Sequence, residues 1–73
     1  MTPDIANRVI ASSTQEIRQL LDHALRAAQA ADAWASAGVP EQAVRMLMDV
    51  KQPIFDATTL LNAASLVHRM PRE

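Results

Sequence analysis

Gly38-Val39-Pro40 is the stretch that decides the fold, because it separates two long tracts of helix-forming residues. Gly38 is the only glycine of the chain, and glycine most readily adopts the left-handed conformation in which helices end. Pro40 suits the first position of a new helix, where its missing N–H group would have no partner. These three residues therefore predict a tight turn between two helices.

Both tracts that flank the turn have the composition of helices. Alanine, leucine, glutamine and arginine are frequent, and no stretch alternates polar and apolar residues as a strand does. We expect helices over about residues 3–37 and 40–70, each roughly 45–50 Å long at 1.5 Å per residue. Equal lengths favour an antiparallel hairpin. The predicted fold is all-α, with a single helical domain over residues 1–73.

The second tract carries a row of apolar residues at heptad spacing. The row consists of Ala43, Leu47, Val50, Ile54, Ala57, Leu61 and Ala64, and ends in His68. Small and large residues alternate along it, which is typical of a helix that packs against another helix. We therefore expect this row to face the first helix.

Two positions are predicted to disturb the helices. Ser13-Thr14-Gln15-Glu16 has the form of a capping box, which begins a helix, but the apolar residues before it keep nearly the same phase. A break at Ser13 and a continuous helix both remain open. Pro53 removes one backbone donor and crowds the preceding turn. Because the apolar row keeps its phase across Pro53, we expect a kinked, continuous second helix.

The second tract has more apolar surface than one neighbouring helix can cover. A further stripe lies on another side of it and consists of Val44, Met48, Phe55 and Leu66. Exposed apolar patches of this kind usually mark interfaces, and the chain is short for a self-sufficient core. We therefore predict that this stripe contacts protein, and that two hairpins dimerise into a four-helix bundle.

These features predict a non-enzymatic interaction protein. It is expected to be a homodimer, or a hairpin that completes its fold on a helical partner, and to serve as an adaptor, a chaperone-like subunit or a regulator. The alternative is a nucleic-acid-binding regulator, because Arg8, Arg18 and Arg26 share one face of the first helix. Asp4 and Asp22 interleave with these arginines, and no exposed aromatic residue accompanies them, so nucleic acid is the less favoured partner.

Residues with catalytic or metal-binding chemistry are scattered along the chain. Neither His23 nor His68 has a second histidine or an acidic residue four positions away, as a helical metal site needs. Asp49 and Asp56 share a face, but arginine lies close by and favours a solvated surface. Residues 12–14 lack the histidine and acid that activate a nucleophile. We expect no catalytic residue, cofactor or metal.

Charge and hydropathy indicate the compartment. The formal net charge of −1 gives no general attraction to nucleic acid or to anionic membranes. No apolar stretch approaches the roughly 20 residues that cross a bilayer, and the first residues do not have the pattern of a signal peptide. The chain contains no cysteine, which excludes disulfides. We expect a soluble, cytoplasmic protein without a membrane partner.

Overall fold

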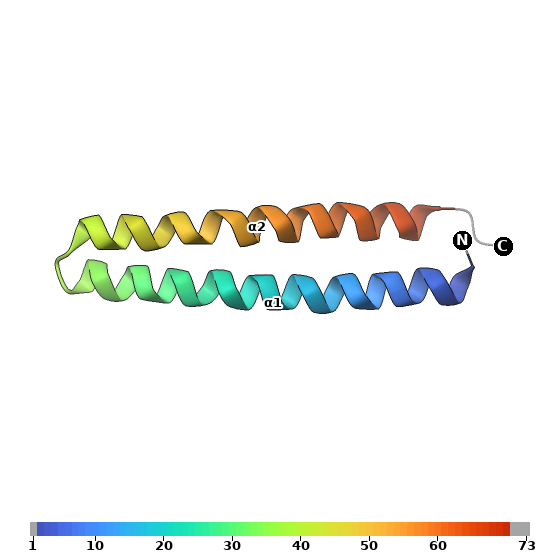
Figure 1. The fold of residues 1–73 in the computed structure, drawn as a ribbon, viewed down its shortest axis with the longest axis horizontal. Coiled ribbons are helices and arrows are strands. Elements are labelled where there is room, and N and C mark those ends of the chain that lie inside the picture. The colour runs from blue at the N-terminus through green and yellow to red at the C-terminus, as the bar shows by residue number, and fades with distance from the viewer. Residues whose placement is uncertain (1, 71–73) are drawn as a thin grey trace.

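The computed structural model describes residues 2–70 and shows two long antiparallel helices (Figure 1). Helix α1 comprises Pro3–Ser36, and helix α2 comprises Pro40–Arg69. The all-α hairpin is thus confirmed, with helix bounds within one residue of those predicted. Met1 and residues 71–73, at the ends of the predicted domain, lie outside the described residues.

The hairpin is long and thin, with principal extents of 58 × 14 × 10 Å. Its radius of gyration is 16.8 Å, whereas a compact domain of this length has a value of about 11 Å. The two helices contact only each other within residues 2–70. Each helix therefore has one covered side and a large area facing solvent.

Each helix begins with a residue suited to that position. At the start of α1, the Thr2 hydroxyl oxygen accepts a hydrogen bond from the Ile5 N–H group at 3.4 Å. Helix α2 has no side-chain cap, but Pro40 at its first position needs no partner for a donor. Glu41 in the first turn of α2 places a negative charge at the positive end of the helix dipole.

The turn between the helices is a Schellman motif built on Gly38. The Gly38 N–H group donates to the Ala35 carbonyl and the Val39 N–H group donates to the Trp34 carbonyl, both at 3.0 Å. Gly38 has a φ of 79°, in the left-handed region. Apart from its chain neighbours, no atom lies within 4 Å of the place where a Cβ would sit. Glycine is therefore required here for its backbone conformation and not for space.

The seam between the helices follows a strict heptad spacing of three and four residues. On α1 the seam residues are Ala6, Ile10, Ser13, Ile17, Leu20, Ala24, Ala27 and Ala31. On α2 they are Ala43, Met46, Val50, Pro53, Ala57, Leu60, Ala64 and Val67. The most deeply buried of these are alanines and Pro53, and no large side chain in residues 2–70 is fully buried. The small residues permit close approach of the two helices.

The predicted row on α2 is correct at four positions and wrong at four. Ala43, Val50, Ala57 and Ala64 are buried or half-buried, whereas the other four are exposed, namely Leu47, Ile54, Leu61 and His68. At each of these four levels, the residue immediately before the predicted one lies in the seam instead. Two apolar residues are adjacent at three of these levels (46–47, 53–54 and 60–61), so the spacing alone does not decide which one faces α1.

Both helices continue through the predicted interruptions. Helix α1 is one helix of 34 residues, and its Thr14 hydroxyl donates to the Ile10 carbonyl at 2.8 Å, within the helix. The break that the capping-box pattern allowed at Ser13 is therefore absent, and Ser13 lies half-buried in the seam. Helix α2 passes through Pro53 without a break, as expected from the phase of its apolar residues.

Candidate protein-interaction surfaces

Large apolar side chains are mostly on the outside of this hairpin. Within residues 2–70, twelve of them are exposed to between 41% and 64%, whereas the buried residues are five alanines and Pro53. Groups of exposed large apolar side chains on a protein surface usually mark sites that another molecule covers. The distribution of these twelve side chains over the surface therefore defines the candidate sites.

One lateral side of the hairpin carries an apolar surface that spans both helices. We call it the leucine flank and define it by five exposed residues: Leu21, Leu25, Leu47, Ile54 and Leu61. Each of them directly follows a seam residue in the sequence. Leu21, Ile54 and Leu61 line one shallow depression over the seam. Leu25 lies one turn from Leu21, and Leu47 lies seven residues from Ile54, so the surface continues along both helices.

Two threonine hydroxyls that border the leucine flank donate hydrogen bonds within their own helices. The Thr58 hydroxyl, beside Ile54 and Leu61, donates to the Ile54 carbonyl at 2.9 Å. Thr14 borders the flank near Leu61 and donates to the Ile10 carbonyl at 2.8 Å. Both hydroxyl donors therefore keep their partners when another molecule covers this side. Burial then avoids the cost of an unpaired donor, about 1–3 kcal/mol for each.

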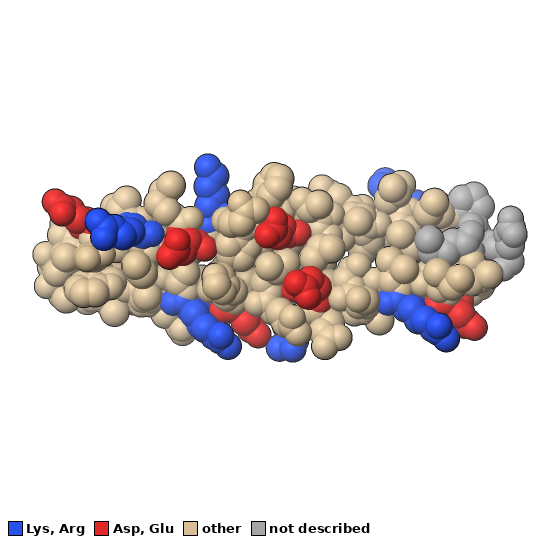
Figure 2. Space-filling model, in the orientation of Figure 1, with Lys and Arg blue, Asp and Glu red and all other residues tan. Residues whose placement is uncertain are grey.

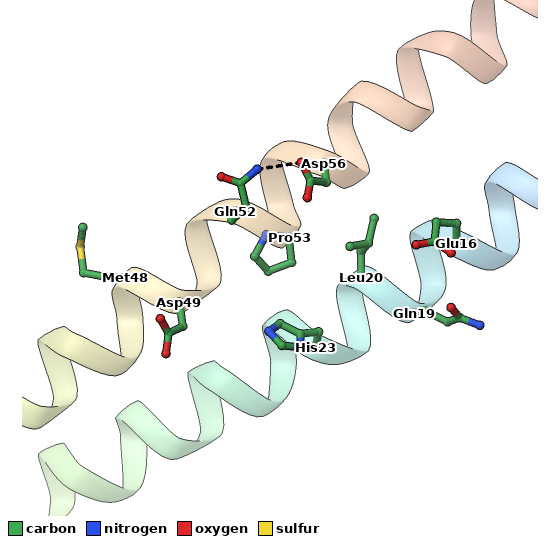
Figure 3. A pocket seen from close by; sticks show the side chains of 9 residues that line it. All are labelled: Glu16, Gln19, Leu20, His23, Met48, Asp49, Gln52, Pro53 and Asp56. Atoms are coloured by element: carbon green, nitrogen blue, oxygen red, sulfur yellow. Dashed lines mark hydrogen bonds between the residues drawn. The ribbon is translucent and has the colours of Figure 1, made fainter.

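A second apolar surface lies on the side of α2 that faces away from α1. We call it the outer stripe, and it consists of the four residues predicted from the sequence, Val44, Met48, Phe55 and Leu66, all exposed. In Figure 3, Met48 points away from α1. Lys51, Thr58 and Ser65 are exposed and lie between the leucine flank and the rest of the outer stripe from Met48 onward. Val44 lies seven residues before Lys51, in line with this row and one turn from Leu47, so the two apolar surfaces of α2 meet near Val44 and are separate after it.

The opposite lateral side of the hairpin is polar, and we call it the polar flank. Its ionisable residues are Glu16, His23, Asp49 and Asp56, each directly before a seam residue. Figure 2 shows acidic side chains over both helices on this face. The Gln52 amide donates to the Asp56 carboxylate at 2.8 Å (Figure 3). This side is therefore suited to remain in contact with water.

The polar flank contains a shallow depression, but the described residues there do not form a buried polar cluster or a metal site. Leu20 and Pro53 form its floor, with His23 and Asp49 pointing into the same space from facing helices (Figure 3). No polar or charged residue is buried in the described part of the chain. Within residues 2–70, no three residues among His, Cys, Asp and Glu lie close enough to hold a metal ion.

The three arginines of the alternative nucleic-acid face are exposed on α1. Arg18 forms an ion pair with Asp22 at 3.2 Å, on the same side of the helix. Arg8 and Arg26 each lie more than two helical turns from Arg18. Asp22 lies between Arg18 and Arg26, so an acidic group interrupts the row. An exposed pair of this type contributes less than about 1 kcal/mol. The arginine row stays a prediction, and the structure adds no aromatic residue to it.

No model of a known protein family, no curated protein and no solved structure matches this chain. Neither helix of residues 2–70 is long and apolar enough to cross a membrane. The sequence predicts the outer stripe but not the leucine flank. Leu47, Ile54 and Leu61 repeat every seven positions, and this spacing predicts a place in the seam, whereas the structure exposes all three.

Proposed function

We propose that this protein is a non-enzymatic helical interaction protein. It acts by burying the apolar sides of its hairpin against the helices of a partner, as an adaptor, a chaperone-like subunit or a regulator. The partner is a second copy of the chain or another helical protein. The observation that carries this proposal is the exposure of twelve large apolar side chains, while the most deeply buried seam residues are small.

The size of the apolar surface makes association favourable. Fully burying one leucine, isoleucine or phenylalanine side chain contributes about 1.5–3 kcal/mol. The leucine flank has five such residues, each roughly half exposed. Covering them contributes about 5 kcal/mol, which is comparable with the net stability of a small domain. This contribution favours association, and it offsets the entropy cost of bringing two chains together.

Site-specific photocrosslinking in the cells that make the protein tests the proposed function. A benzophenone amino acid replaces Leu47 in the leucine flank, Met48 in the outer stripe, or the exposed Gln29 of α1, outside both apolar surfaces, as the matched control. We expect protein cross-links from position 47 or position 48 and none from position 29. If positions 47 and 48 give no more protein cross-links than position 29, the proposed function is wrong.

A further inference from the structure

We propose that the leucine flank binds the leucine flank of a second copy of this chain. The two hairpins lie antiparallel, with their turns at opposite ends of a four-helix bundle and the two-fold axis beside Ile54. This inference rests on the proposed function and deepens it, because it names the partner, the surface and the relative orientation.

The exposed area of the chain agrees with the area that a stable dimer buries. The hairpin exposes 5461 Å², whereas a compact monomer of 8.0 kDa exposes about 4,450 Å². The excess is about 1,000 Å², and a standard protein–protein interface buries about 800 Å² on each partner. One second copy on one side of the hairpin is therefore enough to bring the exposed area to the value of a compact protein.

The spacing of the leucine flank on α2 is self-complementary. Leu47 and Leu61 lie seven residues on either side of Ile54, on the same side of the helix. A two-fold axis beside Ile54 places the two Ile54 side chains together, and it places Leu47 of each copy against the partner's Leu61. Such an interface uses the same surface on both copies, as closed dimers do.

Leu21 and Leu25 of helix α1 lie on either side of nearly the same level of the hairpin. Ile54 and Asp22 are equally far from Gly38 along the chain, and the midpoint of Leu21 and Leu25 is one residue from Asp22. An antiparallel arrangement therefore places Leu21 of one copy near the partner's Leu25. The apolar contact then includes both helices of each hairpin.

The pattern of residues is that of helices with two covered sides. In a four-helix bundle each helix uses the seam positions and one adjacent position, about three residues in seven. Leu47, Ile54 and Leu61 supply that additional position on α2. The outer stripe is a weaker candidate for this contact, because it comes from α2 alone and Thr59 and Asn62 interrupt it before Leu66.

Two neighbouring substitutions test which surface holds the second copy. Ile54→Asp places a carboxylate on the two-fold axis, and Phe55→Asp makes the same change on the outer stripe. Sedimentation equilibrium should give a dimer for the native chain and for Phe55→Asp, and a dimer dissociation constant at least 100-fold higher for Ile54→Asp. A monomeric native chain at millimolar concentration overturns the proposal, and so does a dimer that only Phe55→Asp dissociates.

Single cysteines test the orientation without a charged side chain, and the chain has no other cysteine. Ile54→Cys should form a disulfide-linked dimer under mild oxidation. Leu47→Cys alone should not, because the two copies of position 47 lie about 20 Å apart in the antiparallel dimer. A mixture of Leu47→Cys and Leu61→Cys should form the linked pair. Efficient linkage of Leu47→Cys to itself overturns the antiparallel arrangement.

The photocrosslinks separate failure of this inference from failure of the proposed function. If the leucine flank holds a second copy, position 47 should cross-link two copies of the chain to each other. If position 47 links only to a different protein, the leucine flank does not bind a second copy, and the proposed function still holds. If neither position 47 nor position 48 links to protein, both proposals are wrong.

Discussion

Ile54 and Phe55 are neighbours in the chain, yet they lie on different surfaces of α2. Ile54 lines the depression that it shares with Leu21 of α1, and it is 42% exposed. Phe55 is 64% exposed and lies about 100° further around the helix, on the side away from α1. The polar row that includes Lys51 and Thr58 runs between the two surfaces. Helix α2 therefore offers two separate apolar contacts, and adjacent residues report on them independently.

Gly38→Ala should destabilise the hairpin by about 1 kcal/mol. The substitution has space for its methyl group but forces a residue with a Cβ into the left-handed region, at a φ of 79°. Gly38→Asn should lose less, because asparagine tolerates this conformation better. Urea unfolding followed by circular dichroism, at one fixed protein concentration, measures the difference. Equal stability of the alanine variant and the native chain would contradict a conformational role for Gly38.

Ala24→Leu should push the helices apart and destabilise the chain by about 1–3 kcal/mol. Ala24 is buried in the seam, and a larger side chain there forces off-rotamer packing or a backbone shift. Ala33→Leu, on an exposed side of the same helix, is the matched control and should change stability by less than about 0.5 kcal/mol. Thermal unfolding compares the two. A similar effect of both substitutions would mean that Ala24 is not in a tight seam.

Pro53→Ala should stabilise the chain by about 1–2 kcal/mol. Alanine is about 3 kcal/mol more favourable than proline inside a helix, because it restores a backbone donor and removes a steric clash. The lost part of the buried proline ring offsets about 1.5 kcal/mol of this gain.

Pro40→Ala is the control for this change, because proline at the first position of a helix is not unfavourable. Urea unfolding of both variants should therefore show a gain only at position 53. A loss of stability in Pro53→Ala would indicate that packing of the ring against α1 outweighs the backbone effect.

The alternative function as a nucleic-acid regulator has a direct test. If Arg8, Arg18 and Arg26 contact phosphates, affinity for duplex DNA or RNA should fall steeply as salt rises, and Arg26→Gln should reduce that dependence. The interleaved Asp22 and its ion pair with Arg18 lead us to expect no binding at 150 mM salt. Gel shifts over a range of salt concentrations decide between these outcomes. Salt-dependent binding that Arg26→Gln weakens would support the alternative.

The bounds of the helices could be predicted because local signals mark them. Gly38 ends α1 through its own backbone conformation, and Pro40 begins α2 because it lacks a donor. These effects depend on single residues and their nearest neighbours. The phase across Pro53 was equally informative, since an apolar pattern that continues in register favours one helix over two. In contrast, the residues around Ser13 are compatible with either a helix start or a continuous helix. In the structure, Ser13 packs in the seam with Ile10 and Ile17, and the helix is continuous.

The assignment of the candidate surfaces could be predicted only in part. The outer stripe, with Met48 and Phe55, was predicted as an exposed surface and is exposed. Heptad spacing predicts Ile54 in the seam and Pro53 as a disturbance of the helix. The structure instead buries Pro53 in the seam and exposes Ile54 beside it. Its depression between Leu21 and Ile54 identifies the leucine flank, which requires both helices to be placed side by side.

The amino-acid sequence by itself determined that this protein is two helices joined at Gly38, because backbone conformation and hydrogen bonding at a helix end are local properties. It also determined that α2 has more apolar residues than one neighbour can cover. Only the tertiary structure decided which of two adjacent apolar residues, such as Pro53 and Ile54, faces α1. The reason is physical: helix rotation follows the summed packing of all seam residues, and no single residue specifies that sum.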